Sequence, residues 1–282
     1  MEQEKFDTFI TAKSNPFKLN IKETAKYKDL IWLFVQRDFK TKYKQTILGP
    51  LWFIIQPLLT TFIFTIVFGQ IAKLSTDGVP QFLFYLAGNV PWLFFAACLT
   101  HTSTTFYENA RLFGRVYFPR IVTPISTVIT CFFNFLIQFV MFLIIDLVFI
   151  FTGANVQITW YALLSPLLIL QLGILGMGVG IIISSLTVKY RDLQVLVSFG
   201  VQLWMYLSPV VYSVSSIENA TLKTIVMLNP VSPIIEFMRS GFLGAGASLW
   251  LYWGISLAIT LLIAFFGVVI FNKTEKNFMD KI

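Results

Sequence analysis

The feature that most constrains this chain is a series of long apolar stretches, most of them near the length that crosses a lipid bilayer. A bilayer core of roughly 30 Å is crossed by about 20 helical residues, and helices satisfy their own backbone groups where water is absent. The composition agrees, because 56% of the residues are hydrophobic and only 12% are charged. We predict an all-α membrane protein with six transmembrane helices, at approximately residues 51–71, 82–104, 121–151, 160–186, 193–212 and 249–271.

Positive charge is distributed unevenly between the two sides of this topology. Short loops rich in Lys and Arg remain in the cytoplasm. Of the 21 Lys and Arg residues, 18 lie before residue 51, in the loops after the second and fourth predicted spans, or in the C-terminal tail. We therefore expect both termini in the cytoplasm. The net charge of +7 then reflects topology and contact with anionic membrane lipids, and it does not indicate a nucleic-acid partner.

The segment before the first span has the pattern of an amphipathic helix, with apolar residues on one face and basic residues elsewhere. A basic helix of this kind lies in the headgroup layer of a membrane. The alternative is a helix packed on a soluble domain, but the apolar run that starts at Leu51 favours an interfacial helix. We expect the chain to turn at Gly49-Pro50 into the first span. The apolar face consists of Tyr27, Leu30, Ile31, Phe34, Val35 and Phe39.

Residues 213–248, on the outer side, are too apolar for a solvated loop, yet their prolines and charges make them a poor span. Short helices that re-enter the outer leaflet fit this composition. Glu236 and Arg239 are three residues apart, so they share a helix face and can neutralise one another where an unpaired charge costs several kcal/mol. Such a pair is more often structural than a substrate ligand. We predict a re-entrant gate that includes Pro230, Pro233, Glu236 and Arg239.

Two predicted cytoplasmic connections, residues 107–120 and 188–193, concentrate charge in short segments. The first alternates charged and aromatic residues, a pattern that fits a short helix lying across the membrane. Taken alone, both connections are ordinary positively charged cytoplasmic loops.

Three motifs follow one another along the chain: TKYKQTILGPLWFIIQP, then VKYRDLQVLVSFGVQLWMYLSPVVY, then LNPVSPIIEFMRSGF. With these motifs the chain resembles the ABC-2 type permease subunits that export cell-envelope polysaccharides, including O-antigen, teichoic-acid and capsule exporters. The similarity covers nearly the whole chain after about residue 25. The resemblance implies a homodimer of six-span subunits that encloses a channel in the cytoplasmic membrane of a bacterium. It also implies two copies of a separate ATP-binding subunit and an undecaprenyl-type lipid-linked polysaccharide as cargo.

The resemblance assigns coupling to the partner's ATPase to the two cytoplasmic connections. The residues concerned are Glu108, Arg111, Arg115, Lys189, Tyr190, Arg191 and Asp192. The chain has no GxxxxGK[ST] sequence to hold nucleotide phosphates. We therefore predict a non-catalytic transport subunit without a cofactor or metal of its own, in which ATP and Mg²⁺ belong to the partner. The glycines of the fourth span allow close helix packing, as small residues do in membranes; they are Gly173, Gly176, Gly178 and Gly180.

A sugar polymer that crosses a membrane needs a lining of aromatic faces and exchangeable hydrogen bonds, and the resemblance places the first and fifth spans along the channel. Gln56 and Gln202 are the most informative positions, because an amide that faces lipid is costly without a partner. Hydrogen bonding between helices is an equal alternative for both amides. The predicted channel-lining residues are Phe53, Gln56, Thr60 and Phe64 on the first span and Phe199, Gln202 and Tyr206 on the fifth.

Asp146 is the clearest acidic residue at membrane depth, and intramembrane carboxylates indicate function in many membrane proteins. Proton coupling is one interpretation. No relay of other acids or histidines accompanies Asp146, so we expect it to cap or orient a neighbouring group.

The sequence therefore divides into a cytoplasmic N-terminal segment with an interfacial helix (1–50), a six-span transmembrane domain (51–272) and a cytoplasmic tail (273–282). Three other functions remain open. A membrane-embedded transferase needs a cluster of acid, base or Arg residues at its donor site. An ion-driven secondary transporter usually shows internal repeats and ionisable residues at the midplane. An ABC-2 type exporter of a lipid or drug would share the topology described here.

Overall fold

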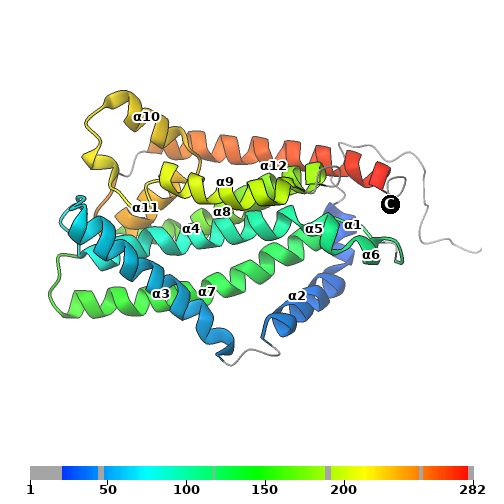
Figure 1. Ribbon diagram of the computed structural model, residues 1–282, viewed down its shortest axis with the longest axis horizontal. Coiled ribbons are helices and arrows are strands. Elements are labelled where there is room, and N and C mark those ends of the chain that lie inside the picture. Colours follow the sequence, from blue (N-terminus) through cyan, green and yellow to red (C-terminus); the bar gives the residue numbers. More distant parts are fainter. Residues whose placement is uncertain (1–20, 44–47, 117, 188–191, 248–249, 279–282) are drawn as a thin grey trace, which may run out of the picture.

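A computed structural model of the chain describes residues 21–43, 48–116, 118–187, 192–247 and 250–278, and these residues form helices and no strand. The long helices lie side by side along the longest axis of the molecule, while α2 (Lys28–Tyr43) and the first span cross them obliquely (Figure 1). The prediction of an all-α protein is confirmed.

Within the described residues, five helical stretches are long and apolar enough to cross a membrane. They agree with the predicted spans to within a few residues at most boundaries, because continuous apolar sequence without helix breakers favours helices of this length. The first stretch is Gly49–Ile71, with α3 at Trp52–Phe64 and a π-helical end, η2, at Thr65–Ile71. The next two are α4 (Gln81–Ser103) and α7 (Val122–Phe151). The last two are Trp160–Thr187, with a short 3₁₀ turn, η3, at Trp160–Leu164 and then α8 at Ser165–Thr187, and Trp250–Thr274, which lies within α12 (Trp250–Phe278).

The fifth predicted span differs from the others. The helix α9 (Leu193–Leu207) has 15 residues, which is a rise of about 22 Å at 1.5 Å per residue. That length is shorter than a bilayer core of roughly 30 Å. The predicted continuation of the helix to Tyr212 is wrong, because the backbone becomes extended at Ser208.

The core of the bundle is built around α4, which contacts α3, α7, α8, α9 and α11 (Ser232–Phe242). Small residues let α8 approach its neighbours closely. A Cβ atom added at Gly180 would lie 2.6 Å from Cβ of Thr102 on α4, and one added at Gly178 would lie 3.2 Å from Cα of Ala264 on α12. The prediction that these glycines serve helix packing is confirmed.

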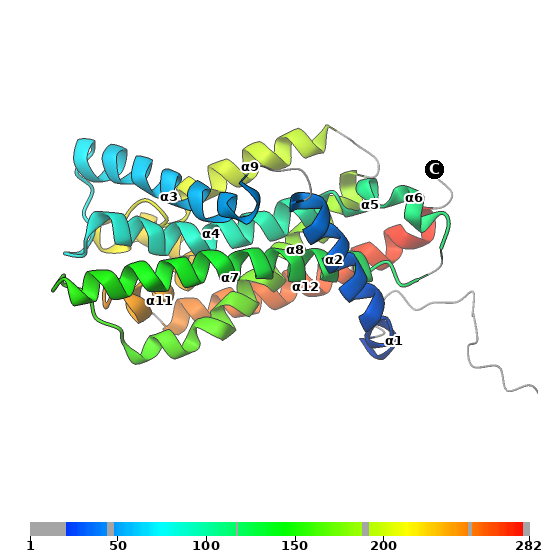
Figure 2. The ribbon, with the colours of Figure 1, turned by 90° about the horizontal axis from the view of Figure 1, so that it is seen from below.

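The predicted amphipathic helix is present as α2, after a short helix α1 (Ile21–Lys26). Its apolar face packs against α7 and buries Phe34 and Val35. Figure 2 shows α2 lying across α4 and α7 near one end of the bundle. The predicted turn lies at the start of the first span, where Gly49 has a φ of +46° and Pro50 occupies the first turn of the helix; glycine adopts such a φ without strain.

The connections between the spans also contain short helices. The predicted cytoplasmic helix in residues 107–120 is divided between two single turns, α5 (Thr105–Glu108) and α6 (Ala110–Phe113). On the opposite end, residues 213–248 contain a 3₁₀ turn at Val214–Ser216, α10 (Ala220–Leu228) and α11. Both α10 and α11 pack against α12.

Candidate functional site

Most of the predicted channel-lining residues of the first and fifth spans lie on the outside of the single chain. Both α3 and α9 pack on α4 and lie along the same edge of the bundle (Figure 2). Gln56 and Gln202 are exposed there, and neither amide forms a hydrogen bond within the described part of the chain. We call this edge the α3–α9 face.

The α3–α9 face contains most of the predicted lining residues. Phe199 and Tyr206 are 60% and 45% exposed, and Phe53 and Thr60 are half-buried. Phe64 points into the bundle instead, where its ring packs edge-to-face against Tyr85 of α4. Phe64 therefore does not reach the surface of the single chain.

Hydrogen bonding between membrane helices, the alternative considered for Gln56 and Gln202, occurs at another glutamine. Gln171 of α8 donates to Ser256 of α12 over 2.9 Å and accepts from the indole nitrogen of Trp253 over 3.1 Å. Sequence reasoning missed this residue, although a glutamine among apolar residues of a predicted span is itself a signal of such a bond.

The described residues among those predicted to couple to an ATPase lie in or next to α5, α6 and the start of α9, and α5 and α6 stand at one end of the bundle (Figure 1). Glu108, at the end of α5, and Arg115, after α6, are exposed, as is Asp192 immediately before α9. Arg111 lies in α6, and its side chain is outside the described set. Lys189, Tyr190 and Arg191 lie outside the described residues.

At the opposite end, Glu236 and Arg239 form the predicted ion pair. Arg239 Nη1 lies 3.1 Å from Glu236 Oε1, and the two side chains are 0% and 1% exposed. The pair is structural in its contacts, because each charged group also bonds to the backbone of another segment.

Arg239 makes more contacts with other segments than Glu236 does. Its Nη2 donates to the carbonyl oxygen of Val210 over 2.7 Å and its Nη1 to that of Tyr212 over 3.3 Å. Its guanidinium carbon lies 3.7 Å from the ring centroid of Phe84 on α4, a cation–π contact. Arg239 thereby joins α11, α4 and the segment after α9.

The two prolines of the predicted gate have distinct positions. Pro233 lies in the first turn of α11, where a missing amide hydrogen costs nothing. The carbonyl oxygen of Pro230 accepts a hydrogen bond from Ser256 of α12. The turn between α10 and α11 is therefore tied to the last span.

Asp146 is fully buried in α7. Neither of its carboxylate oxygens has a hydrogen-bond partner among the described residues. The expectation that Asp146 caps or orients a neighbouring group is therefore wrong within that part of the chain.

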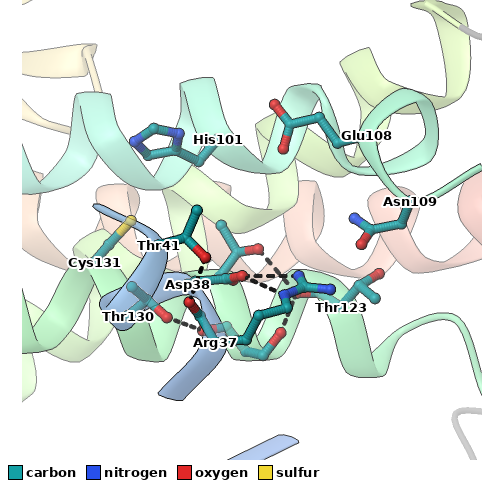
Figure 3. Close-up of a pocket in the computed structure, with 11 residues that line it drawn as sticks. Arg37, Asp38, Thr41, His101, Glu108, Asn109, Thr123, Thr130 and Cys131 are labelled. Atoms are coloured by element: carbon teal, nitrogen blue, oxygen red, sulfur yellow. Dashed lines mark hydrogen bonds and ion pairs between the residues drawn. The ribbon is translucent and has the colours of Figure 1, made fainter. Parts of the chain in front are cut away.

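A polar pocket that sequence reasoning missed lies between α2, the junction of α4 with α5, and α7, with a volume of about 520 Å³. Figure 3 shows His101, Glu108 and Asn109 on one side, Thr123 and Thr130 on the other, and Arg37, Asp38 and Thr41 on α2 across the opening. Ser126, Thr127 and Cys131 of α7 complete the lining. The only signal in the sequence was the repeat of hydroxyl residues at one-turn spacing along residues 123–130.

The sequence profile of the ABC-2 type transporter family matches residues 29–243, which include the α3–α9 face, the polar pocket and the Glu236–Arg239 pair. The chain belongs to the ABC-2 type transporter family. It is therefore a membrane-spanning transport component that works with an ATP-binding partner.

Relatives of known name align over most of the chain. An O-antigen export system permease protein of Klebsiella pneumoniae is 30% identical over 253 residues, which are 89% of this chain and 94% of the relative. An O-antigen export system permease protein of Myxococcus xanthus is 26% identical over 78% of this chain and 81% of the relative. A polysialic acid transport protein of Escherichia coli is 23% identical over 85% of this chain and 91% of the relative.

Proposed function

We propose that this chain is the permease subunit of an ABC transporter that exports a lipid-linked cell-envelope polysaccharide across the cytoplasmic membrane of a bacterium. The observation that carries the proposal is the similarity to O-antigen export permeases over 89% of the chain. Similarity to a polysialic acid transport protein supports the wider class of polysaccharide cargo.

The proposed topology has six spans, with α9 as a short fifth span, and both termini in the cytoplasm. The concentration of Lys and Arg at one end supports this orientation. The helices α10 and α11 re-enter the outer leaflet and form a gate. The Glu236–Arg239 pair supports this placement in the outer leaflet. Two opposite charges can exist at membrane depth because they are paired with one another and completely buried in protein.

The proposed assembly is a homodimer with a channel between the two copies. Exposed amides at Gln56 and Gln202 are costly against lipid, so the α3–α9 face needs water, cargo or a second copy opposite it. By contrast, the exposed residues of α12 at Leu261, Leu262, Phe265 and Phe266 are apolar and suit contact with lipid. The α3–α9 face is therefore the side on which the channel is proposed.

The proposed energy source is a pair of ATP-binding subunits that hold ATP and Mg²⁺, and this chain is non-catalytic. These subunits dock on the end of the bundle that carries Glu108, Arg115 and Asp192. Charged, exposed side chains next to the first residues of α9 suit a contact that transmits movement to that helix.

Export is tested by expressing this chain with its ATP-binding partner in a bacterium that lacks its own polysaccharide permease. Polysaccharide on the cell surface and a lipid-linked glycan that co-elutes with the purified complex are the expected results. A complex that carries no glycan, and whose ATPase activity responds to phospholipids or drugs instead, would contradict the cargo class.

A further inference from the structure

Among the described residues, the polar pocket offers many hydrogen-bond acceptors, and the hydroxyl donors of its threonines are already engaged. The hydroxyls of Thr123, Thr127 and Thr130 already donate to backbone carbonyls of the preceding turn, over 2.8, 3.0 and 2.9 Å. A hydroxyl whose hydrogen is used in this way keeps its oxygen lone pairs for a ligand. Thr41, on the opposite wall, is bonded in the same manner to the carbonyl oxygen of Arg37. The pocket therefore selects a ligand that brings its own hydrogen-bond donors.

The charges of the pocket also favour a ligand that donates hydrogen bonds over a ligand that is an anion. Among the described residues that line the pocket, Asp38 and Glu108 carry carboxylates and Arg37 carries a guanidinium, which is already paired with Asp38 at 2.8 Å. Like charges brought together in a partly desolvated site repel one another. Among these described residues a diphosphate would meet two carboxylates and one guanidinium that is already engaged, so this lining disfavours it.

The shape of the pocket separates two remaining ligand types. The row of acceptors on α7 runs from Thr123 to Thr130, which is about 10 Å of helix at 1.5 Å per residue. An ammonium group, such as that of a lipid headgroup, needs a few acceptors around one point. A sugar residue presents several hydroxyl donors along its length, and about 520 Å³ is within the range of small-molecule sites.

The position of the pocket fits a sugar that is attached to a lipid. The pocket lies under α2, whose exposed Trp32 and Leu33 suit insertion among lipids beside the basic residues of the same helix. We propose that the polar pocket binds the sugar that is attached to the lipid carrier, with its hydroxyls on the α7 oxygens and the carboxylates. This proposal rests on the proposed export of a lipid-linked polysaccharide and names where such a cargo is first held.

Binding is measured on the complete complex with its ATP-binding partner in lipid nanodiscs. The probes are undecaprenyl diphosphate that carries N-acetylglucosamine and undecaprenyl diphosphate without a sugar. We expect the sugar-bearing probe to bind at least about 10-fold more tightly. Removal of two acceptors in Thr127→Val/Thr130→Val should reduce that preference by about 3-fold for each hydrogen bond lost, which nearly abolishes it, and should leave the bare probe unaffected.

Two further variants separate a binding role from a structural one. Thr65→Val removes a hydroxyl with the same type of bond, to the carbonyl oxygen of Thr61, outside the pocket, and should change neither affinity. Glu108→Gln should weaken the sugar-bearing probe and strengthen the bare one, because it removes a negative charge without changing shape. A purely structural effect would weaken both probes together.

Equal affinity of the wild-type complex for the two probes would overturn the proposal, as would displacement of the sugar-bearing probe by phosphatidylethanolamine. An unchanged preference in the double threonine variant would also overturn it. These results are distinguishable from failure of the proposed function, because export by the wild-type complex is measured separately. A complex that exports polysaccharide but shows no sugar preference refutes the pocket alone.

Discussion

Replacement of Arg239 tests the contact network on which the outer end of the fold depends. In Arg239→Met the carboxylate of Glu236 is left without the guanidinium 3.1 Å away, in a site where both side chains are buried. Removal of one partner of a buried ion pair typically lowers the free energy of unfolding by about 3–5 kcal/mol. The substitution also removes the donors to the carbonyl oxygens of Val210 and Tyr212, so we expect a loss at the upper end of that range.

A variant that also removes the charge of Glu236 separates the electrostatic part of this loss of stability from the rest. In Glu236→Gln/Arg239→Met no unpaired carboxylate remains, while the two carbonyls still lack their donors. Because an unsatisfied buried group costs roughly 1–3 kcal/mol, we expect the double variant to recover about half of the loss. The amide of Gln at position 236 keeps an oxygen acceptor for the backbone amide of Ala247, which now donates to Glu236 over 2.9 Å.

The assay is the midpoint of heat-induced aggregation of the detergent-purified complex, read by size-exclusion chromatography at a fixed heating time because such unfolding is irreversible. A loss of 3–5 kcal/mol corresponds to a shift of roughly 6–20 °C for a chain of this size. Lys223→Met removes a positive charge from α10, outside the network, and serves as the control. A midpoint for Arg239→Met equal to that of the control, or a double variant no more stable than the single one, would refute the reasoning.

Three other predictions follow from the same structure. In a chain with Cys98 and Cys131 replaced by Ala, cysteines at Gln56 and Tyr206 should react with a water-soluble thiol reagent faster than one at Leu261, which is 57% exposed but apolar in its surroundings; equal rates would remove the α3–α9 face from the channel. Arg115→Glu should leave membrane insertion intact and uncouple the partner's ATPase activity from export, measured together in proteoliposomes, and normal export would argue against coupling at this site. Gly180→Val should destabilise the complex by about 1–3 kcal/mol or more through overpacking, because a Cβ there lies 2.8 Å from the carbonyl oxygen of Leu99; Gly200→Val, where nothing lies within 4 Å of the added Cβ, is the matched control, and equal midpoints in heating would contradict close packing of α8 on α4.

Local patterns predicted those parts of the fold that depend on residues near one another in sequence. Apolar length gave the positions of α4, α7 and α12, and the helical spacing of Phe34 and Val35 gave the buried face of α2. The three-residue spacing of Glu236 and Arg239 gave the ion pair. In each case one helix determines the geometry, so no knowledge of distant contacts was needed.

The polar pocket could not be predicted in this way, because it is assembled from residues of α2, the α4–α5 junction and α7. Neither the lengths nor the periodicities of these segments specify that Asp38, Glu108 and Thr130 line one space. The same reason applies to Phe64, which shares a helical repeat with Gln56 but lies against Tyr85. Helical spacing identifies a face, and tertiary packing decides what that face meets.

The shortness of α9 and the burial of Arg239 explain one another. The apolar sequence continues to Tyr212. The helix nevertheless ends at Leu207, so the backbone that follows lacks helical hydrogen bonds. Non-helical backbone at membrane depth is tolerated only where protein satisfies its polar groups. Ser208 and Val210 are fully buried, and Arg239 supplies donors to the carbonyl oxygens of Val210 and Tyr212. A charged residue in an apolar segment therefore replaces the hydrogen bonds that a longer helix would have made, and Glu236 balances its charge. Any movement of α9 along its axis must break these bonds or carry α11 with it, so this end of the helix is mechanically linked to the proposed gate.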